Sequence, residues 1–330
     1  MWPHPMLIVR TPVRVSFCGG GTDLPAFYKN SDDGGLVTSV ALDAYIYVTV
    51  NKRFDNAIRV SYSQTENVDD FEELKHELVR EAMRLTGVTS GIEITTIADI
   101  PGQGTGLGSS SSVTVGLLHA LHAYAGREVT AKQLAEEACK IEIELLGQPI
   151  GKQDQYAAAF GGLNQIRFNS DESVDVIALD SAASSSLGSN FCLVWTGLTR
   201  KASSILEQQS RNTASKMEQL EAMRAQATQV TGLIEAGDFS AVGELLGNTW
   251  ELKRTLADGI SNPEIDELYD QLMKLGCTGG KLLGAGGGGF ILVQTPPNVQ
   301  QKIATNLTNK IIPLNPDLHG STLILDDRGE

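Results

Sequence analysis

At 330 residues the chain exceeds the size at which single hydrophobic cores stop growing, so we expect two domains. Its 26 basic and 40 acidic residues give a net charge of −14, which repels polyphosphate backbones and argues against nucleic acid as a partner. No apolar run approaches the roughly 18 residues of a membrane span, and no leader-like segment opens the chain. The sequence therefore predicts a soluble, cytoplasmic protein with no membrane partner, and it leaves the oligomeric state open.

The first distinctive feature is a glycine turn that carries one carboxylate. Residues 7–18 alternate like a β-strand and run into Gly19-Gly-Gly-Thr-Asp-Leu-Pro25. The turn has a purely structural interpretation, in which Asp23 caps the next helix. In a functional interpretation, the glycines let a ligand lie against the backbone while Asp23 accepts hydrogen bonds from hydroxyls. The candidate substrate-binding residues are Gly20, Gly21, Thr22 and Asp23.

A sheet and a helix are expected next. Residues 36–50 and 58–62 alternate like strands. Residues 71–85 repeat apolar positions at helical spacing and stop before Gly87, which predicts an amphipathic helix. Residues 91–98 have the short, β-branched character of another strand.

That strand leads into a glycine loop and an apolar helix, with the sequence Ile100-Pro-Gly-Gln-Gly-Thr-Gly-Leu-Gly-Ser-Ser-Ser-Ser112. Glycines let the backbone approach an anion closely, and the amide groups of a first helical turn lack intrahelical partners. These donors and the helix dipole favour negative charge, so the loop is interpreted as a phosphate cradle. A flexible linker is the alternative, but an apolar strand and an apolar helix flank the loop directly. No Gly-x-x-x-x-Gly-Lys-[Ser/Thr] pattern occurs.

A second helix, over residues 131–146, precedes a polar cluster that begins Gly151-Lys-Gln-Asp154. An aspartate in the first turn of a helix interacts favourably with the helix dipole, and alone Asp154 would indicate only the start of a helix. Transfer of a γ-phosphoryl group, however, needs a metal ligand, a positioned base and a cation, and Glu142, Asp154 and Lys152 supply one of each. Glu144 is the second choice for the metal, because a helix places positions 142 and 144 about 200° apart.

The serine-rich stretch 181–189 is interpreted as a boundary between domains 1–185 and 186–330. A strand at 191–195 and helices reaching residue 275 lead to a third glycine-rich segment, Gly279-Gly-Lys-Leu-Leu-Gly-Ala-Gly-Gly-Gly-Gly-Phe290. This segment lacks the following helix that a dinucleotide site requires, because residues 290–295 form a strand pattern. A helix at 298–309 and a strand at 321–325 complete the α+β pattern.

The three glycine segments together resemble motifs of the small-metabolite kinases named for galactokinase, homoserine kinase, mevalonate kinase and phosphomevalonate kinase, the GHMP kinases. Pro101 with Gly106-Leu-Gly-Ser-Ser110 resembles their second motif, although the loop here carries one extra residue. The Gly-x-x-Thr-Asp turn resembles that of the sugar kinases, with Gly20 and Gly21 where galactokinases have Glu and His. The string Arg-Thr-Pro-x-Arg-x-Ser-Phe-x-Gly-Gly-Gly-Thr-Asp-Leu-Pro is most similar to bacterial D-glycero-D-manno-heptose 7-phosphate kinases, followed by fucokinase-type enzymes.

The resemblance implies a ribosomal-protein-S5-like N-terminal domain, a ferredoxin-like C-terminal domain, and an active site between them. It implies ATP-dependent phosphorylation of the O1 hydroxyl of heptose 7-phosphate, giving a 1,7-bisphosphate for nucleotide-activated heptose and surface polysaccharide. Asp154 would orient or deprotonate the O1 hydroxyl, and Lys152 or Arg14 would offset the negative charge that develops during transfer. Ser110 and Glu142 would hold Mg²⁺. The implied ATP-binding residues are Pro101, Gly104, Gly106, Leu107, Gly108, Ser109, Ser110 and Ser111. Arg200, Gly286 and Gly287 join the expected substrate-binding residues.

Alternatives remain at this point. Within the family, a fucokinase-like or other hexose 1-kinase fits the same motifs. Outside it, the glycine loops are compatible with a nicotinamide-dependent oxidoreductase. A non-catalytic sugar or nucleotide sensor on the kinase scaffold is a further alternative, against which the joint presence of Asp154 and Glu142 argues.

Overall fold

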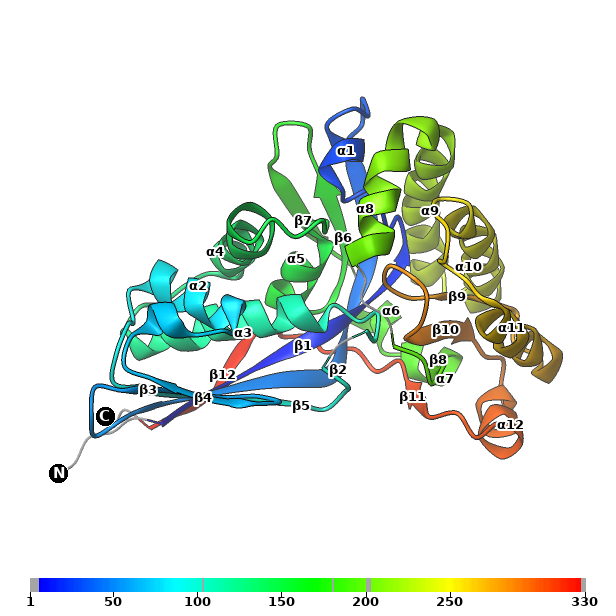
Figure 1. The fold of residues 1–330 in the computed structure, drawn as a ribbon. Coiled ribbons are helices and arrows are strands. Elements are labelled where there is room, and N and C mark those ends of the chain that lie inside the picture. Colours follow the sequence, from blue (N-terminus) through cyan, green and yellow to red (C-terminus); the bar gives the residue numbers. More distant parts are fainter. Residues whose placement is uncertain (1–5, 103, 180, 200–202, 328–330) are drawn as a thin grey trace.

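In the computed structural model, which describes residues 6–102, 104–179, 181–199 and 203–327, the strands form one sheet of eight and one of four (Figure 1). The larger sheet contains β1 (Met6–Cys18), β2 (Gly35–Lys52), β3 (Ile58–Ser61), β4 (Thr65–Val68), β5 (Ile92–Ala98), β6 (Leu163–Phe168), β7 (Val174–Ala178) and β12 (Thr322–Asp326). Its main path is β12-β1-β2-β5-β3-β4, and β6 pairs with β2 and carries β7. Because β2 is long, one half pairs with β5 and the other with β6.

Helices cover one face of this sheet (Figure 1). They are α2 (Glu77–Thr86), α3 (Ser109–Tyr124), α4 (Ala131–Cys139) and α5 (Gln153–Phe160), with the short α1 (Pro25–Tyr28) after β1. Helix α3 packs against β1 and β2 on one side and against α2, α4 and α5 on the other, and most of its apolar side chains are buried. The predicted strand, glycine loop and helix are therefore confirmed, and the loop that begins α3 is held by the core of the domain.

Two helices depart from the expected α-helical form. The helix expected at 71–85 is a 3₁₀ turn, η1 (Phe71–Glu73), followed by α2. The carboxylate of Glu66 accepts hydrogen bonds from the backbone amides of Lys75 and His76 at 2.6 and 3.1 Å, which takes those amides out of a continuous helical ladder. After α4 the chain continues as a π-helix, η2 (Lys140–Leu145).

The smaller sheet contains β8 (Phe191–Trp195), β9 (Gly279–Leu282), β10 (Phe290–Gln294) and β11 (Ile311–Pro313), all antiparallel. Its order, β11-β8-β10-β9, is that of a ferredoxin-like sheet and confirms this prediction. The accompanying helices are α6 (Ser181–Ser184), α7 (Leu187–Asn190), α8 (Ser203–Asn212), η3 (Thr213–Ser215), α9 (Met217–Glu235), α10 (Phe239–Arg254), α11 (Pro263–Leu275) and α12 (Val299–Asn306).

The two halves share a hydrophobic core. Helix α9 packs on β1 and β2 of the larger sheet, and the ring of Phe17 on β1 meets that of Phe191 on β8 edge to face, with centroids 5.7 Å apart. The expected division between residues 185 and 186 lies between α6 and α7, but β12 returns to pair with β1, so this division separates β12 from its own sheet. None of the helices in the described ranges is both long and apolar enough to cross a membrane.

Candidate active site

A cavity of about 610 Å³ lies where the two halves meet. Its walls come from the turn after β1, the glycine loop before α3, the start of α5, helices α8 to α10, and the segment around β9. All three glycine-rich segments singled out in the sequence therefore reach one space.

The glycine loop before α3 is shaped by its backbone. Gly104, Gly106 and Gly108 have φ values of 71°, 77° and 72°, which L-residues with side chains rarely adopt. A Cβ on Gly106 would lie 2.7 Å from the carbonyl oxygen of Leu283, so the loop packs directly on the third glycine segment. Gly108 is the N-cap of α3 and no side chain caps the helix, which leaves amide donors of its first turn available.

The expected nucleotide-binding residues divide into two groups. Six of them line the cavity: Gly104, Gly106, Gly108, Ser109, Ser110 and Ser111. Leu107 is fully buried in the core shared by the two halves, and Pro101 is exposed outside the cavity. Neither residue lines the cavity in this structure, so their expected contact with the nucleotide stays a prediction.

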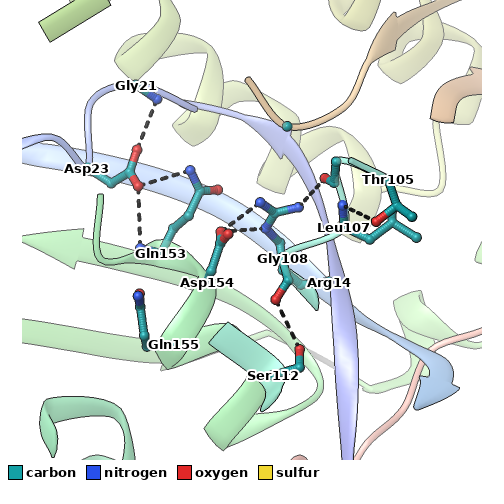
Figure 2. A network of polar contacts seen from close by, with 12 residues as sticks. Arg14, Gly21, Asp23, Thr105, Leu107, Gly108, Ser112, Gln153, Asp154 and Gln155 are labelled. Carbon is teal, nitrogen blue, oxygen red and sulfur yellow. Dashed lines mark hydrogen bonds and ion pairs between the residues drawn. The ribbon is translucent and has the colours of Figure 1, made fainter. Parts of the chain in front are cut away.

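Arg14 and Asp154 form an ion pair in the cavity (Figure 2). Nε and Nη2 of Arg14 lie 2.8 and 2.7 Å from Oδ1 of Asp154, and Nη1 donates to the carbonyl of Gly106 at 2.6 Å. The arginine side chain is 5% exposed and the aspartate 23%. A Cβ on Gly108 would lie 3.0 Å from Oδ2 of Asp154. The Asp154 carboxylate is thus fixed on one side by a cation and lies beside the N-terminus of α3 on the other.

A second carboxylate, Asp23, faces the same cavity. Its Oδ1 accepts from the amide of Gly21 and its Oδ2 from Nε2 of Gln153, both at 3.0 Å (Figure 2). A Cβ on Gly151 would lie 1.9 Å from Oδ2, so only glycine fits behind it. Burial, and then the charge of Asp154, raise the pKa of Asp23. Its partners are neutral donors, which suits a residue that accepts hydrogen bonds from hydroxyls.

The remaining residues of that turn differ in position. Gly20 and Gly21 line the cavity, as expected. Thr22 is fully buried, and its hydroxyl lies 2.7 Å from the carbonyl oxygen of Gly19 and 3.0 Å from that of Leu36. Thr22 therefore holds the turn together and does not face the ligand space.

Glu142 lies directly behind Ser110, on the π-helix η2. Its carboxylate is fully buried and accepts from Ser110 Oγ at 3.1 Å and from Gln155 Nε2 at 2.7 Å. Burial raises the pKa of Glu142 to about 7. Glu144, by contrast, is exposed. Nowhere in the described ranges do three or more His, Cys, Asp or Glu side chains gather as a metal-binding group.

Lys152 departs from its expected role. Its Nζ donates to the backbone carbonyl of Glu172 at 3.1 Å and lies 5.4 Å from the centroid of the Tyr28 ring. Lys152 does not line the cavity. The Glu172 carbonyl and the Tyr28 ring hold the ammonium group of Lys152, and of the two expected cations it is Arg14 that contacts Asp154.

The third glycine segment also differs from expectation. Gly284 and Ala285 line the cavity, whereas Gly286 and Gly287 do not. A Cβ on Gly286 would lie 2.7 Å from Cα of Ile260, and the amide of Gly287 donates to the Ile260 carbonyl at 2.9 Å. These two glycines permit backbone packing and do not touch the ligand space. Arg200, the remaining expected substrate residue, lies outside the described residues.

Two buried lysines that line the cavity, Lys253 and Lys281, were not predicted from the sequence. Lys281 stands in β9 between glycines and leucines, and a charged residue in such an apolar strand was an available signal. Lys253 precedes Arg254 near the end of α10, which is the usual pattern of a surface helix terminus, so nothing in the sequence marked it.

Comparison with known families and proteins agrees with this geometry. The family described as "GHMP kinases N terminal domain" matches residues 74–162, and "GHMP kinases C terminal" matches residues 230–312. The chain is 30% identical over 308 residues to the D-glycero-alpha-D-manno-heptose 7-phosphate kinase of Campylobacter jejuni, covering 87% of this chain and 89% of the relative. It is 28% identical over 363 residues to the L-fucokinase/L-fucose-1-P guanylyltransferase of Bacteroides fragilis, covering 97% of this chain and 38% of that protein.

Among solved structures, a D-glycero-D-manno-heptose 1-phosphate kinase from Bacteroides thetaiotaomicron superposes with a TM-score of 0.77 at 23% identity, covering 96% of this chain and 97% of the other. That likeness confirms the two-part α+β fold. The matched families and the relatives are kinases, which contradicts the oxidoreductase alternative. The chain belongs to the GHMP kinases, as an ATP-dependent sugar kinase.

Proposed function

We propose that the protein transfers the γ-phosphoryl group of ATP to the anomeric hydroxyl of D-glycero-D-manno-heptose 7-phosphate. The observation that carries the chemistry is the position of Asp154, which pairs with Arg14 and lies beside the first turn of α3. The support for the sugar is the similarity to the Campylobacter jejuni heptose 7-phosphate kinase over most of both chains.

Asp154 acts on the attacking hydroxyl. Phosphoryl transfer passes through a loose transition state in which positioning and charge stabilisation matter more than early proton removal. The Asp154 carboxylate accepts a hydrogen bond from the sugar O1 and takes its proton as the new O–P bond forms. Arg14 fixes the carboxylate and presents positive charge near the reacting atoms. Lys152 has no part in this step.

The nucleotide phosphates lie along the glycine loop and the first turn of α3. Gly104, Gly106 and Gly108 allow close approach of the backbone, and the uncapped amides donate to phosphate oxygens. Ser109 to Ser111 add hydroxyl groups at the same place.

The residues around Ser110 fit a magnesium ion. Glu142 is a buried carboxylate that accepts hydrogen bonds from the neutral side chains of Ser110 and Gln155, and burial raises its pKa to about 7. Mg²⁺ in nucleotide sites is held by one or two carboxylates together with phosphate oxygens. Glu142 and Ser110 would hold it here, and when bound the ion neutralises charge on the phosphates.

The sugar occupies the side of the cavity formed by the turn after β1. Asp23 accepts hydrogen bonds from its hydroxyls, and Gly20 leaves space beside the turn, since a Cβ there would meet only Ser16 Oγ at 4.0 Å. The space beside Gly21 is taken by the side chain of Gln209. A hexose 1-kinase is the second candidate, favoured by the match of 97% of this chain to the fucokinase-containing protein of Bacteroides fragilis.

ADP formation with a panel of sugars tests the proposal. Heptose 7-phosphate, the unphosphorylated heptose, fucose, mannose and galactose are compared at matched concentrations, and ³¹P NMR locates the new phosphate. We expect the highest kcat/KM with heptose 7-phosphate and an anomeric phosphate in the product. A higher kcat/KM with fucose would favour the hexose kinase instead. ATP binding without turnover of any sugar in the panel would favour the sensor.

A further inference from the structure

Two lysines that the proposed reaction does not use are buried in the wall of the cavity. Lys281 is 2% exposed and Lys253 8%, and both line the ligand space. Lysines are almost never buried to this degree unless they are paired. Within the described residues, neither forms an ion pair with a carboxylate.

The contacts that these lysines do make leave their charge uncompensated. Nζ of Lys281 donates to the carbonyl of Phe17 at 2.8 Å. Nζ of Lys253 donates to the carbonyls of Leu282 and Gly284 at 2.8 and 2.5 Å. An ammonium group has three donors, so two remain on Lys281 and one on Lys253. Carbonyl oxygens satisfy donors, but they do not neutralise a buried positive charge.

A third cation adds to the charge of this region. Burial, and then repulsion by Lys281 and Arg14, lower the pKa of Lys253 well below its usual range. Burial and Arg14 lower the pKa of Lys281 to about 8, although Cys18 opposes that shift. Arg14 has Asp154 as its partner, but the two lysines have no acid of their own. In a chain of net charge −14, the wall of this cavity is thus locally basic.

We propose that Lys253 and Lys281 form a subsite that binds the phosphate carried by the acceptor sugar. This inference rests on the proposed function, because the phosphate in question is the 7-phosphate of the proposed acceptor, which does not react. A phosphate dianion supplies the missing negative charge and accepts the free ammonium donors.

The location favours the acceptor over the nucleotide. Lys281 is bonded to Phe17 on β1, two residues before the turn that presents Gly20, Gly21 and Asp23 to the sugar. The first turn of α3 and the glycine loop already supply donors for the nucleotide phosphates. Lys253, however, is bonded to Gly284, which packs against Gly106 of that loop. The experiment must therefore distinguish a phosphate of the sugar from a phosphate of the nucleotide.

The first test uses inorganic sulfate, which keeps its charge throughout the useful pH range. Sulfate is titrated calorimetrically into wild-type protein and into Lys281→Met, with Lys274→Met, an exposed lysine on α11, as the matched control. We expect Kd to rise about 10- to 100-fold in Lys281→Met alone, the range for a charge-assisted hydrogen bond. Equal sulfate affinity in all three proteins would show that the lysines only hold backbone carbonyls.

A second measurement needs no variant and covers the case in which Lys281→Met does not fold. Near pH 8, close to the pKa of Lys281, sulfate binding to the wild type should take up protons, because the anion favours the charged lysine. Titrations in buffers of different ionisation enthalpy report this uptake. Binding without any proton uptake would overturn the subsite.

Kinetics then distinguish the source of the phosphate. In Lys281→Met we expect KM for heptose 7-phosphate to rise at least about tenfold, with KM for the unphosphorylated heptose and Kd for ATP unchanged. Weaker ATP binding with an unchanged sugar KM would move the subsite to the nucleotide and overturn the proposal. If wild-type protein turned over no sugar phosphate, the proposed function would fail, whereas sulfate binding at Lys281 would still report on the anion site.

Discussion

The cavity holds two aspartates whose surroundings differ, one on the turn after β1 and one at the start of α5. Asp154 shares its Oδ1 with two nitrogens of Arg14, and this pair joins β1 to α5. Asp23 accepts hydrogen bonds from neutral donors, which are the amide of Gly21 and both the side chain and the backbone amide of Gln153. The same side chain is thus held by a cation in one place and by neutral N–H groups in the other.

This difference separates two chemical roles. A carboxylate that contacts a guanidinium is held in a fixed orientation, which suits a group that acts on the attacking hydroxyl. A buried carboxylate with neutral partners and a raised pKa gains from further hydrogen-bond donors, which sugar hydroxyls supply. Substitutions at the two sites should therefore affect different kinetic constants.

The largest effect is expected at Asp154. Asp154→Asn keeps the shape and removes the charge, so kcat and kcat/KM should fall together by roughly 10² to 10⁴, with ATP affinity little changed. Steady-state kinetics beside a direct ATP titration measure both quantities. Turnover near that of the wild type would remove Asp154 from the mechanism.

A substitution of Arg14 tests whether the geometry of its ion pair with Asp154 matters in addition to its charge. Arg14→Lys keeps a positive charge but loses the fork that contacts both Asp154 and Gly106. We expect kcat to fall about 10- to 100-fold, the equivalent of one charge-assisted hydrogen bond. The exposed Arg211→Lys serves as the control. If Arg14→Lys kept full turnover, charge alone would account for the role of the residue.

These residues also show what the sequence could predict. The alternating and helical periods around the phosphate loop predicted β5, the loop and α3, because the local pattern and the tertiary packing agree there. Asp23, Asp154 and Arg14 followed from the same motifs. Lys152 does not lie beside Asp154 as expected, because its side chain contacts the carbonyl of Glu172 and the ring of Tyr28. Both partners are remote from Lys152 in sequence.

The π-helix and the burial of Lys253 could not be predicted from the sequence for a related reason. Residues 140–145 continue the pattern of α4, and a widened turn leaves the apolar spacing almost unchanged, so nothing distinguished η2 from an α-helix. The placement of Lys253 and Lys281 in the cavity is set by how the smaller sheet packs on β1. Such positions depend on contacts between halves of the chain, which local periodicity does not encode.

A smaller effect, on a different constant, is expected at Asp23. Asp23→Asn retains one acceptor oxygen, and Oε1 of Gln153, which has no partner, allows that amide to turn over and accept from the new NH₂ group. The variant should therefore fold. We expect the sugar KM to rise about tenfold with kcat nearly unchanged, because a hydroxyl bond to a charged acceptor is lost in ground and transition states alike. A fall in kcat as large as that of Asp154→Asn would erase the distinction between the two aspartates.

The third carboxylate of the site, Glu142, extends the comparison to stability. Its folded-state pKa is raised by burial to about 7, above the value of about 4.3 typical of an exposed glutamate. Between these two pH values Glu142 is protonated in the folded protein and ionised in the unfolded chain. The contribution of this proton to the free energy of unfolding is therefore fully present below about pH 4 and is lost as the pH rises through 7. Magnesium-free protein should thus lose stability over this window.

Glu142→Gln removes the titration without removing the shape. Gln155 Oε1 has no partner in the structure, so its amide can turn over and accept from the new NH₂ group. At pH 8 and without Mg²⁺, we expect the variant to exceed the wild type by roughly 1–3 kcal/mol in unfolding free energy, and the two to converge near pH 5. Denaturant unfolding at the two pH values measures this difference, with the exposed Glu144→Gln as the control. Mg²⁺ with ATP should then stabilise the wild type more than the variant, because only the wild type offers the ion a carboxylate. Equal differences at both pH values would show that Glu142 stays ionised throughout, its charge compensated by the groups around it.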